Sequence, residues 1–255
     1  FIAYLDGFSP NVQVILDKFK FRNQIDTMVD ADILGAVIEK FTSSDINLSP
    51  NSIYKDTAQT ILKHPGLDNH GMGTIFEELI RKFNEENNEE AGEHWTPRDV
   101  VELMADLVFM PIADKIKDAS YSCYDGACGT GGMLTVAQER LMTLAHRRSK
   151  DVAIHLFGQE INPETYAICT ADMLLKGDGE EAEHIMYGST LSDDQHASRR
   201  FDFMLSNPPY GKSWKTDAEK MGGKKEILDT RFNTYLENGE TMPMIPRTSD
   251  GQLLF

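Results

Sequence analysis

The sequence has few basic side chains for its length. Its 25 lysines and arginines stand against 41 aspartates and glutamates, so the 255-residue chain carries a formal net charge of −16 at pH 7. Proteins that grip DNA or RNA unaided present a basic surface, because contacts with phosphate groups supply most of their affinity. The composition therefore argues against a free-standing nucleic-acid binder.

Cysteine pairs, long apolar runs and a targeting segment are also missing. Cys123, Cys128 and Cys169 form no Cys-x-x-Cys pair, and an odd number of cysteines fits neither a disulfide framework nor a zinc site, so we expect no metal. No apolar run approaches the roughly 20 residues of a membrane span, and no signal-peptide pattern is present. We therefore expect a cytoplasmic protein without a membrane partner. Because the chain begins at Phe1 rather than at Met, we expect it to be part of a longer protein.

Residues 1–90 are expected to form an N-terminal helical domain. Ser9-Pro10 is typical of a helix start, and apolar residues then recur at helical spacing through Phe19. The same spacing predicts helices over residues 31–41 and 75–83, which a polar connector separates.

Residues 91–255 alternate between extended and helical patterns. Strands are predicted at 121–125, 152–160, 185–187 and 201–206, and helices at 96–108, 131–146 and 162–175. This alternation predicts an α/β fold with a mostly parallel sheet and right-handed crossovers. Ligands of such sheets bind beyond the carboxyl ends of the strands, where the most unusual motifs of this sequence lie.

The first motif is a glycine-rich turn, Asp125-Gly126-Ala127-Cys128-Gly129-Thr130-Gly131-Gly132-Met133. Glycines permit positive φ and let a ligand approach the main chain, although such a loop alone is as readily an ordinary tight turn. Glu160 ends the next strand, where an acid can accept both ribose hydroxyls of a nucleoside. The turn departs from the G-x-G-x-x-G pattern of dinucleotide sites, and Asp125 would repel a pyrophosphate but could hold an ammonium group. These features favour S-adenosylmethionine as the cofactor.

The second motif is Asn207-Pro208-Pro209-Tyr210, directly after the last predicted strand. The N6 amine of adenine is a poor nucleophile because its lone pair is conjugated with the ring. The side-chain carbonyl of Asn207 and the main-chain carbonyl of Pro208 could accept its two N–H groups and free the lone pair, while the prolines stiffen the backbone. Tyr210 would offer a ring on which a flipped base stacks. An ordinary Pro-Pro turn is the alternative.

The third motif, Glu93-His94-Trp95-Thr96-Pro97-Arg98, precedes a predicted helix. It has the pattern of a helix start with an aromatic anchor. A helix N-terminus also presents free N–H groups to a carboxylate, such as the one at the methionine end of the cofactor. The two interpretations are compatible.

Over nearly its whole length the chain resembles the modification (M) subunit of type I restriction–modification systems, an N6-adenine DNA methyltransferase. The matching segments occur in the family's order, at residues 9–12, 21–24, 73–81, 93–104, 125–134, 158–164, 207–211 and 249–255. The resemblance implies an N-terminal helical domain that helps to embrace double-stranded DNA, followed by a Rossmann-like, S-adenosylmethionine-dependent methyltransferase sheet over residues 91–255. It also implies three protein partners: a specificity (S) subunit that chooses the DNA sequence, a second copy of the M subunit, and a restriction (R) subunit.

The three motifs and the resemblance together indicate the following candidate site residues. The candidate cofactor-binding residues are Glu93, His94, Trp95, Thr96, Pro97, Arg98, Asp125, Ala127, Gly129, Thr130, Gly131, Gly132 and Glu160. The candidate catalytic residues are Asn207, Pro208, Pro209 and Tyr210.

The sequence departs from the family pattern in several places. Gly126 stands where proline is usual, Trp95 where phenylalanine or tyrosine is usual, and Ser189 where aspartate or asparagine is common. The last departure leaves open which residue contacts the adenine ring of the cofactor. The family's chain also continues well beyond Phe255, so we expect an incomplete catalytic sheet that does not methylate DNA alone.

Two other functions remain open. A methyltransferase for protein glutamine or RNA guanine can use the same Asn-Pro-Pro-Tyr box, although the helical segment 1–90 and the 96–98 motif argue against it. A non-catalytic scaffold is disfavoured because all four residues of the box are intact.

Overall fold

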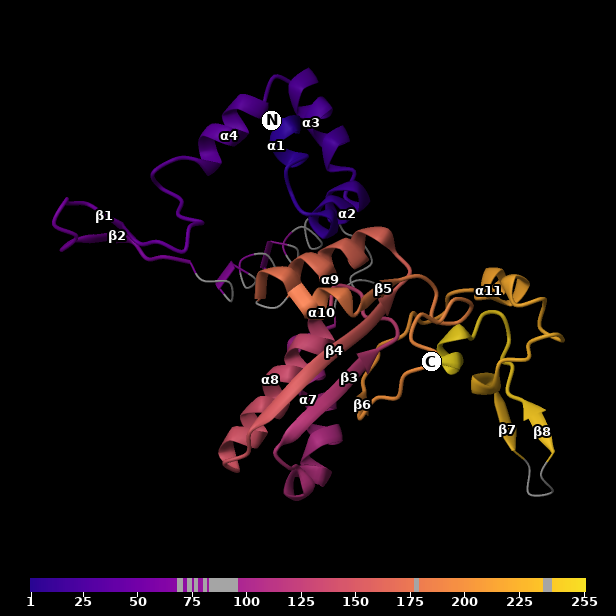
Figure 1. The fold of residues 1–255 in the computed structure, drawn as a ribbon. Helices are drawn as coiled ribbons and strands as arrows, with labels where there is room; N and C mark the ends of the chain where they lie inside the picture. Colours follow the sequence, from indigo (N-terminus) through magenta and orange to yellow (C-terminus); the bar gives the residue numbers. More distant parts are fainter. Residues whose placement is uncertain are drawn as a thin grey trace. The chain divides into compact units, whose positions relative to one another are not determined.

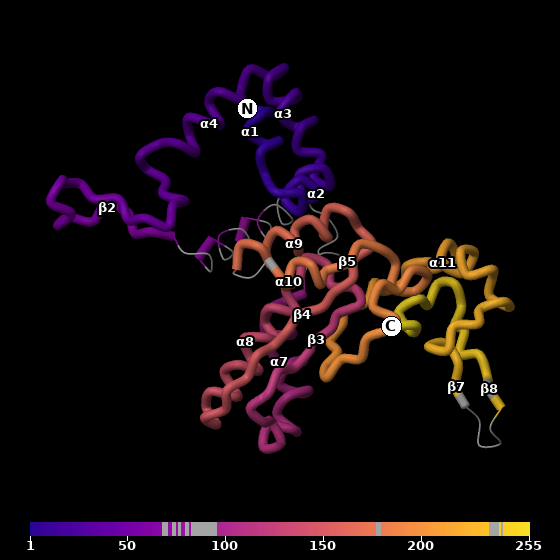
Figure 2. The backbone as a smooth tube through the Cα atoms, in the orientation of Figure 1, coloured from indigo at the N-terminus to yellow at the C-terminus, as the bar shows by residue number. Residues whose placement is uncertain are grey.

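The computed structural model describes residues 1–67, 71–72, 75, 78–79, 82, 96–176, 179–235 and 240–255. The chain divides into two compact units, coloured by sequence in Figures 1 and 2. The first consists of Phe1–Ala91 with Pro163–Glu183, and the second of Gly92–Asn162 with His184–Phe255. The domain boundary expected after residue 90 stays a prediction.

The first unit is mainly helical. Its elements are α1 (Ile2–Leu5), α2 (Pro10–Lys18), α3 (Phe21–Asp30), α4 (Leu34–Phe41), β1 (Ile53–Tyr54), β2 (Leu62–His64), α9 (Pro163–Lys176) and α10 (Gly179–Glu183). Pro10 occupies the first turn of α2, where its missing N–H costs no hydrogen bond, and α2 packs against α9. The predicted helix starting at Ser9-Pro10 is confirmed. The polar connector contains an unpredicted antiparallel hairpin, β1–β2, and the helix predicted at 75–83 lies mostly outside the described residues.

The second unit contains a parallel sheet with the strand order β5-β4-β3-β6 (Figure 1). Its strands are β3 (Ala119–Asp125), β4 (Val152–Glu160), β5 (Ile185–Tyr187) and β6 (Phe203–Met204). All four predicted strands are present, and the α/β fold with a parallel sheet is confirmed. The last strand is shorter than predicted, although the backbone N–H of Leu205 still donates to the Tyr124 carbonyl.

Two helices cover this sheet and bury its core. The helix α8 (Gly132–Arg147) packs on β3 and β4, and α7 (Arg98–Phe109) packs on α8. Phe109 is buried against Phe203 of β6, edge to face, with ring centroids 5.0 Å apart. On the surface, the Arg140 guanidinium of α8 forms an ion pair with Asp106 of α7. The packing fixes the sheet from which the loops of the site project.

The segment after β6 folds around a core of its own, drawn in orange to yellow in Figure 2. Its elements are α11 (Lys215–Lys220), the short 3-10 helices Thr230–Phe232 and Gly251–Leu254, and the hairpin of β7 (Asn233–Tyr235) with β8 (Thr241–Pro243). Trp214, Ile227 and Phe232 are buried together with Leu191 from the loop after β5. None of these elements was predicted, and their core holds the loop after β5 in place.

Within the described ranges, no helix combines the length and the apolar character that a membrane crossing requires. The same ranges contain no group of His, Cys, Asp and Glu side chains arranged to hold a metal ion.

Candidate functional site

Three of the candidate residues, Asp125, Glu160 and Asn207, lie at the carboxyl edge of the parallel sheet. Asp125 ends β3 and pairs in register with Gly158, and Glu160 ends β4 in register with Tyr187, the last residue of β5. The segment leading to Asn207 leaves β6 at the same edge. Loops far apart in the sequence are thereby brought together at the edge where parallel α/β sheets bind their ligands.

The glycine-rich turn between β3 and α8 needs its glycines for backbone conformation and for open space. Gly129 and Gly131 have φ of +54° and +84°, in the left-handed region that favours glycine. The Gly131 N–H donates to the Cys128 carbonyl at 2.8 Å, and α8 begins at Gly132. A Cβ added at Gly129 or Gly132 would meet no atom within 4 Å. The main chain of the turn is therefore open to a ligand.

Glu160 is held rigidly at the end of β4. One oxygen of its carboxylate, Oε2, accepts the Gly129 N–H at 2.8 Å, and the other, Oε1, accepts the Asn162 N–H at 2.6 Å. The residue is only 9 % exposed. Since each carboxylate oxygen has two lone pairs, Glu160 can still accept further hydrogen bonds. It thus joins the glycine-rich turn to β4 and retains acceptor capacity for a ligand.

Asp125 is the most deeply buried acid of the site, at 1 % exposure. Its pKa is raised to about 7, chiefly by burial and also by the negative charge of Glu160, while a hydrogen bond from the Ala127 N–H opposes the rise. The Ala127 N–H donates to Oδ1 at 2.9 Å. Among the described residues no lysine, arginine or histidine forms an ion pair with this carboxyl group, so the position favours a positively charged ligand group.

The Asn207 side chain is oriented by Thr96. Its amide nitrogen Nδ2 donates to the Thr96 hydroxyl oxygen at 3.0 Å, across 111 residues of sequence. This bond uses the N–H side of the amide and leaves the carbonyl oxygen as an acceptor for a substrate. Pro208 is half-buried, whereas Tyr210 is 86 % exposed. The loop therefore presents one oriented acceptor and one free aromatic ring.

The remaining candidates differ in how they relate to this cluster. Pro97 precedes α7, and the Arg98 guanidinium binds the carboxylates of Glu102 and Glu139. Thr130 lies in the glycine-rich turn. The candidates Glu93, His94 and Trp95 lie outside the described residues.

The loop after β5 is tied to both Glu160 and the glycine-rich turn. The Gly188 N–H donates to the Glu160 carbonyl at 3.0 Å, and the Thr190 hydroxyl donates to the Gly126 carbonyl. The fully buried Gln159 donates from Nε2 to the Asp193 carbonyl at 2.7 Å. Three neighbouring loops therefore form one hydrogen-bonded assembly.

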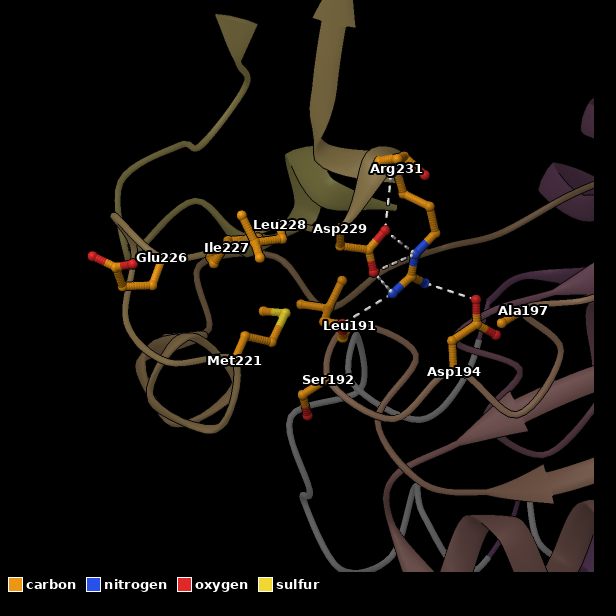
Figure 3. Close-up of a pocket in the computed structure, with 11 residues that line it drawn as sticks. Leu191, Ser192, Asp194, Ala197, Met221, Glu226, Ile227, Leu228, Asp229 and Arg231 are labelled. Atoms are coloured by element: carbon orange, nitrogen blue, oxygen red, sulfur yellow. Dashed lines mark hydrogen bonds and ion pairs between the residues drawn. The ribbon is translucent and has the colours of Figure 1, made fainter. Parts of the chain in front are cut away.

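Arg231 clamps the far side of this loop, beside a cavity of about 530 Å³ (Figure 3). The figure shows its guanidinium between Asp229 and Asp194, with ion-pair distances of 2.6 and 2.9 Å. Arg231 also donates to the carbonyls of Thr190 and Leu191, at 2.7 and 3.1 Å. The hydrogen bonds from Arg231 lower the pKa of Asp229. The apolar part of the cavity wall comes from Leu191, Ala197, Met221, Ile227 and Leu228.

Sequence analysis missed Arg231, the Thr96–Asn207 bond and Asp217, whose Oδ1 accepts hydrogen bonds from two serine hydroxyls of the loop after β5. Arg231 and Asp217 belong to no motif of the sequence, and the Thr96–Asn207 bond joins two motifs that lie 111 residues apart. The only signal in the sequence was the Ser189 departure, which marked that loop as unusual.

Comparison with known proteins places the chain among methylases. A family model described as N-6 DNA Methylase matches residues 67–244. The type I restriction enzyme MpnII methylase subunit of Mycoplasma pneumoniae is 31% identical over 169 residues, which are 63% of this chain and 28% of that protein. The corresponding EcoEI subunit of Escherichia coli is 26% identical over 214 residues, or 80% of this chain and 41% of that one.

One solved structure supports the fold independently. The methyltransferase subunit of a type I restriction-modification system from Streptococcus thermophilus superposes with a TM-score of 0.52 at 26% sequence identity. The match covers 72% of this chain and 34% of the other. The chain thus spans between about a quarter and two fifths of the length of these relatives.

Proposed function

Because this chain belongs to the N-6 DNA methylase family, we propose that it is the catalytic part of a type I adenine-N6 DNA methyltransferase. The observation that carries the proposal is the Asn207 amide at the carboxyl edge of the sheet, which Thr96 holds with its carbonyl oxygen available. That oxygen can accept one N–H of the target adenine amine. The Pro208 main-chain carbonyl would accept the other.

S-adenosylmethionine fits the residues at the ends of β3 and β4. Its ammonium group matches Asp125, a buried carboxyl whose pKa is raised to about 7 and which forms no ion pair with the described residues. Its ribose hydroxyls match the remaining lone pairs of Glu160, and its close approach suits the open space at Gly129 and Gly132. The cofactor would supply an electrophilic methyl group. Thr96, Pro97, Arg98 and the undescribed residues 93–95 are proposed to line its methionine end.

The chain's own groups would prepare the target amine. Two acceptors at Asn207 and Pro208 draw the amine hydrogens out of the plane of the base and make its lone pair available for attack. The exposed Tyr210 ring offers a stacking surface to a base flipped out of the duplex. Preorganised acceptors of this kind lower the barrier without a metal or a strong base.

DNA recognition is proposed to require partners. The net charge of −16 offers no independent grip on phosphates. The relatives named type I methylase subunits favour a complex with a specificity subunit, a second methylase subunit and a restriction subunit on double-stranded DNA. Residues 1–90 would form its N-terminal helical domain, and we propose a cytoplasmic location.

The first test is binding. Isothermal titration with S-adenosylhomocysteine, the stable product form of the cofactor, should give saturable binding by the chain. Glu160→Ala should weaken this binding, whereas the exposed Ser213→Ala should not. A chain that binds no S-adenosylhomocysteine would overturn the cofactor assignment.

The second test follows the methyl group. The chain, assembled with a specificity subunit, is supplied with tritiated S-adenosylmethionine and with DNA, RNA or protein in parallel. Label at N6 of adenine in DNA supports the proposal, and label in RNA or protein instead supports the alternatives. Asn207→Ala should cut DNA labelling by roughly two to three orders of magnitude.

A further inference from the structure

This inference rests on the proposed cofactor, S-adenosylmethionine. The order of the strands predicts where each part of that cofactor lies along the edge of the sheet. Asp125 ends β3 and suits the ammonium group, and Glu160 ends β4 and suits the ribose. The next strand in this direction is β5, since the order is β5-β4-β3-β6. The adenine base, which is attached to the ribose, should therefore lie at the loop that follows β5 and begins at Gly188.

Two serines of that loop hold the side-chain carboxylate of Asp217 in one orientation. The hydroxyls of Ser189 and Ser192 both donate to Oδ1 of Asp217 in α11, each at 2.6 Å. The Ser189 oxygen in turn accepts the Leu191 N–H at 3.3 Å, which directs the serine hydrogen towards Asp217. Ser189 is buried and follows Gly188, whose N–H donates to the Glu160 carbonyl. Asp217 is thus fixed next to the end of β4.

The other oxygen of this carboxylate is available. Within the part of the chain that the structure describes, Oδ2 of Asp217 makes no hydrogen bond, and no lysine, arginine or histidine forms an ion pair with the residue. Asp217 is half-buried. This oxygen can therefore accept a hydrogen bond from a ligand donor.

We infer that Asp217 recognises the adenine of the cofactor by accepting a hydrogen bond from its 6-amine at Oδ2. An ionised carboxylate is only an acceptor, so it matches an exocyclic amine and gains nothing from a purine that lacks one. Ser189 and Ser192 act as positioning residues, since they hold Oδ1 and thereby direct Oδ2. The carboxylate at the β5 position of the site comes from α11, a separate element of the fold.

The experiment removes first the 6-amine of the ligand and then the carboxylate of Asp217. The chain is titrated calorimetrically with S-adenosylhomocysteine and with its purine-riboside analogue, in which hydrogen replaces the 6-amine. The wild-type chain should bind the analogue roughly tenfold or more weakly, as expected for a lost hydrogen bond to a charged group.

Asp217→Asn tests the geometry directly. The two serine hydroxyls require an acceptor, so the carbonyl oxygen of the new amide takes the place of Oδ1 and its NH₂ group takes the place of Oδ2. That group cannot accept from the adenine amine. Affinity for S-adenosylhomocysteine should therefore fall tenfold or more, affinity for the analogue should hold, and the preference should vanish. Glu219→Gln, an exposed carboxylate of the same helix, is the matched control and should keep the preference.

The outcomes separate this inference from the proposed function. If the wild-type chain binds neither ligand, the cofactor assignment itself fails. If it binds both equally, or if Asp217→Asn keeps the preference or weakens both ligands alike, Asp217 does not read the amine. The double substitution Ser189→Ala with Ser192→Ala keeps the carboxylate but releases it, so it should reduce the preference while the thermal unfolding curve remains cooperative.

Discussion

We expect the buried carboxylate of Asp125 to lower the stability of the folded protein when no ligand is bound. Burial raises its pKa from an ordinary 3.8 to about 7, so the folded chain resists the ionisation that the unfolded chain undergoes freely. The unfolded state therefore loses its proton first as pH rises. The penalty is absent below about pH 4, grows between pH 4 and 7, and stays constant above pH 7.

The size of the penalty follows from the shift. Because the pKa of Asp125 rises from 3.8 to about 7 on folding, ionisation of this group lowers the free energy of unfolding by about 4 kcal/mol at pH 8 and by about 2 kcal/mol at pH 5.5. Asp125→Asn removes the charge and keeps an acceptor for the Ala127 N–H. We therefore expect the variant to be more stable than the parent, by an amount that doubles between these two pH values. The same substitution should abolish measurable binding of S-adenosylhomocysteine, because its ammonium group loses its counter-charge.

Urea unfolding at pH 5.5 and pH 8 measures both free energies. Asp114→Asn serves as the control, since this side chain is 97% exposed and surface changes of this kind usually stay within about 0.5 kcal/mol. A variant that is less stable than the parent at pH 8, or a gain that does not change with pH, would refute the reasoning. Retained ligand binding would separately refute the ammonium assignment.

Three further results are expected. Thr96→Val removes the acceptor that orients the Asn207 amide, so single-turnover methyl transfer should slow about tenfold; an unchanged rate would show that Asn207 is oriented without it. Glu160→Ala should weaken the binding of S-adenosylhomocysteine by about 1–3 kcal/mol in titration calorimetry, and unchanged affinity would exclude a contact between Glu160 and the ribose. Arg231→Met should lower the free energy of unfolding in urea by about 1–3 kcal/mol, because two half-buried carboxylates and two carbonyls lose their donor; no loss would mean that the Arg231 contacts add no stability.

The parts of the site with a local sequence pattern could be predicted, and the parts built by tertiary contacts could not. Asp125 and Glu160 stand at the ends of strands whose apolar patterns are clear, so the rule for parallel sheets places them together. Asp217 lies 25 and 28 residues from its two serine partners in a short helix without periodicity. Thr96 was predicted to bind cofactor, but its contact with Asn207 appears only once β6 is placed beside β3.

The adjacency of β3 and β6 has a consequence for the geometry of the reaction. Hydrogen-bonded strands lie about 4.8 Å apart, a spacing that thermal motion barely alters. The two loops that would hold the methyl donor and the methyl acceptor leave neighbouring strands, paired through Cys123 with Phe203 and Tyr124 with Met204. In the proposed reaction, the backbone hydrogen bonds between β3 and β6 would therefore set the distance between the two reactants before either of them binds. Folding of the sheet would then supply much of the alignment of the two reactants that proximity catalysis requires.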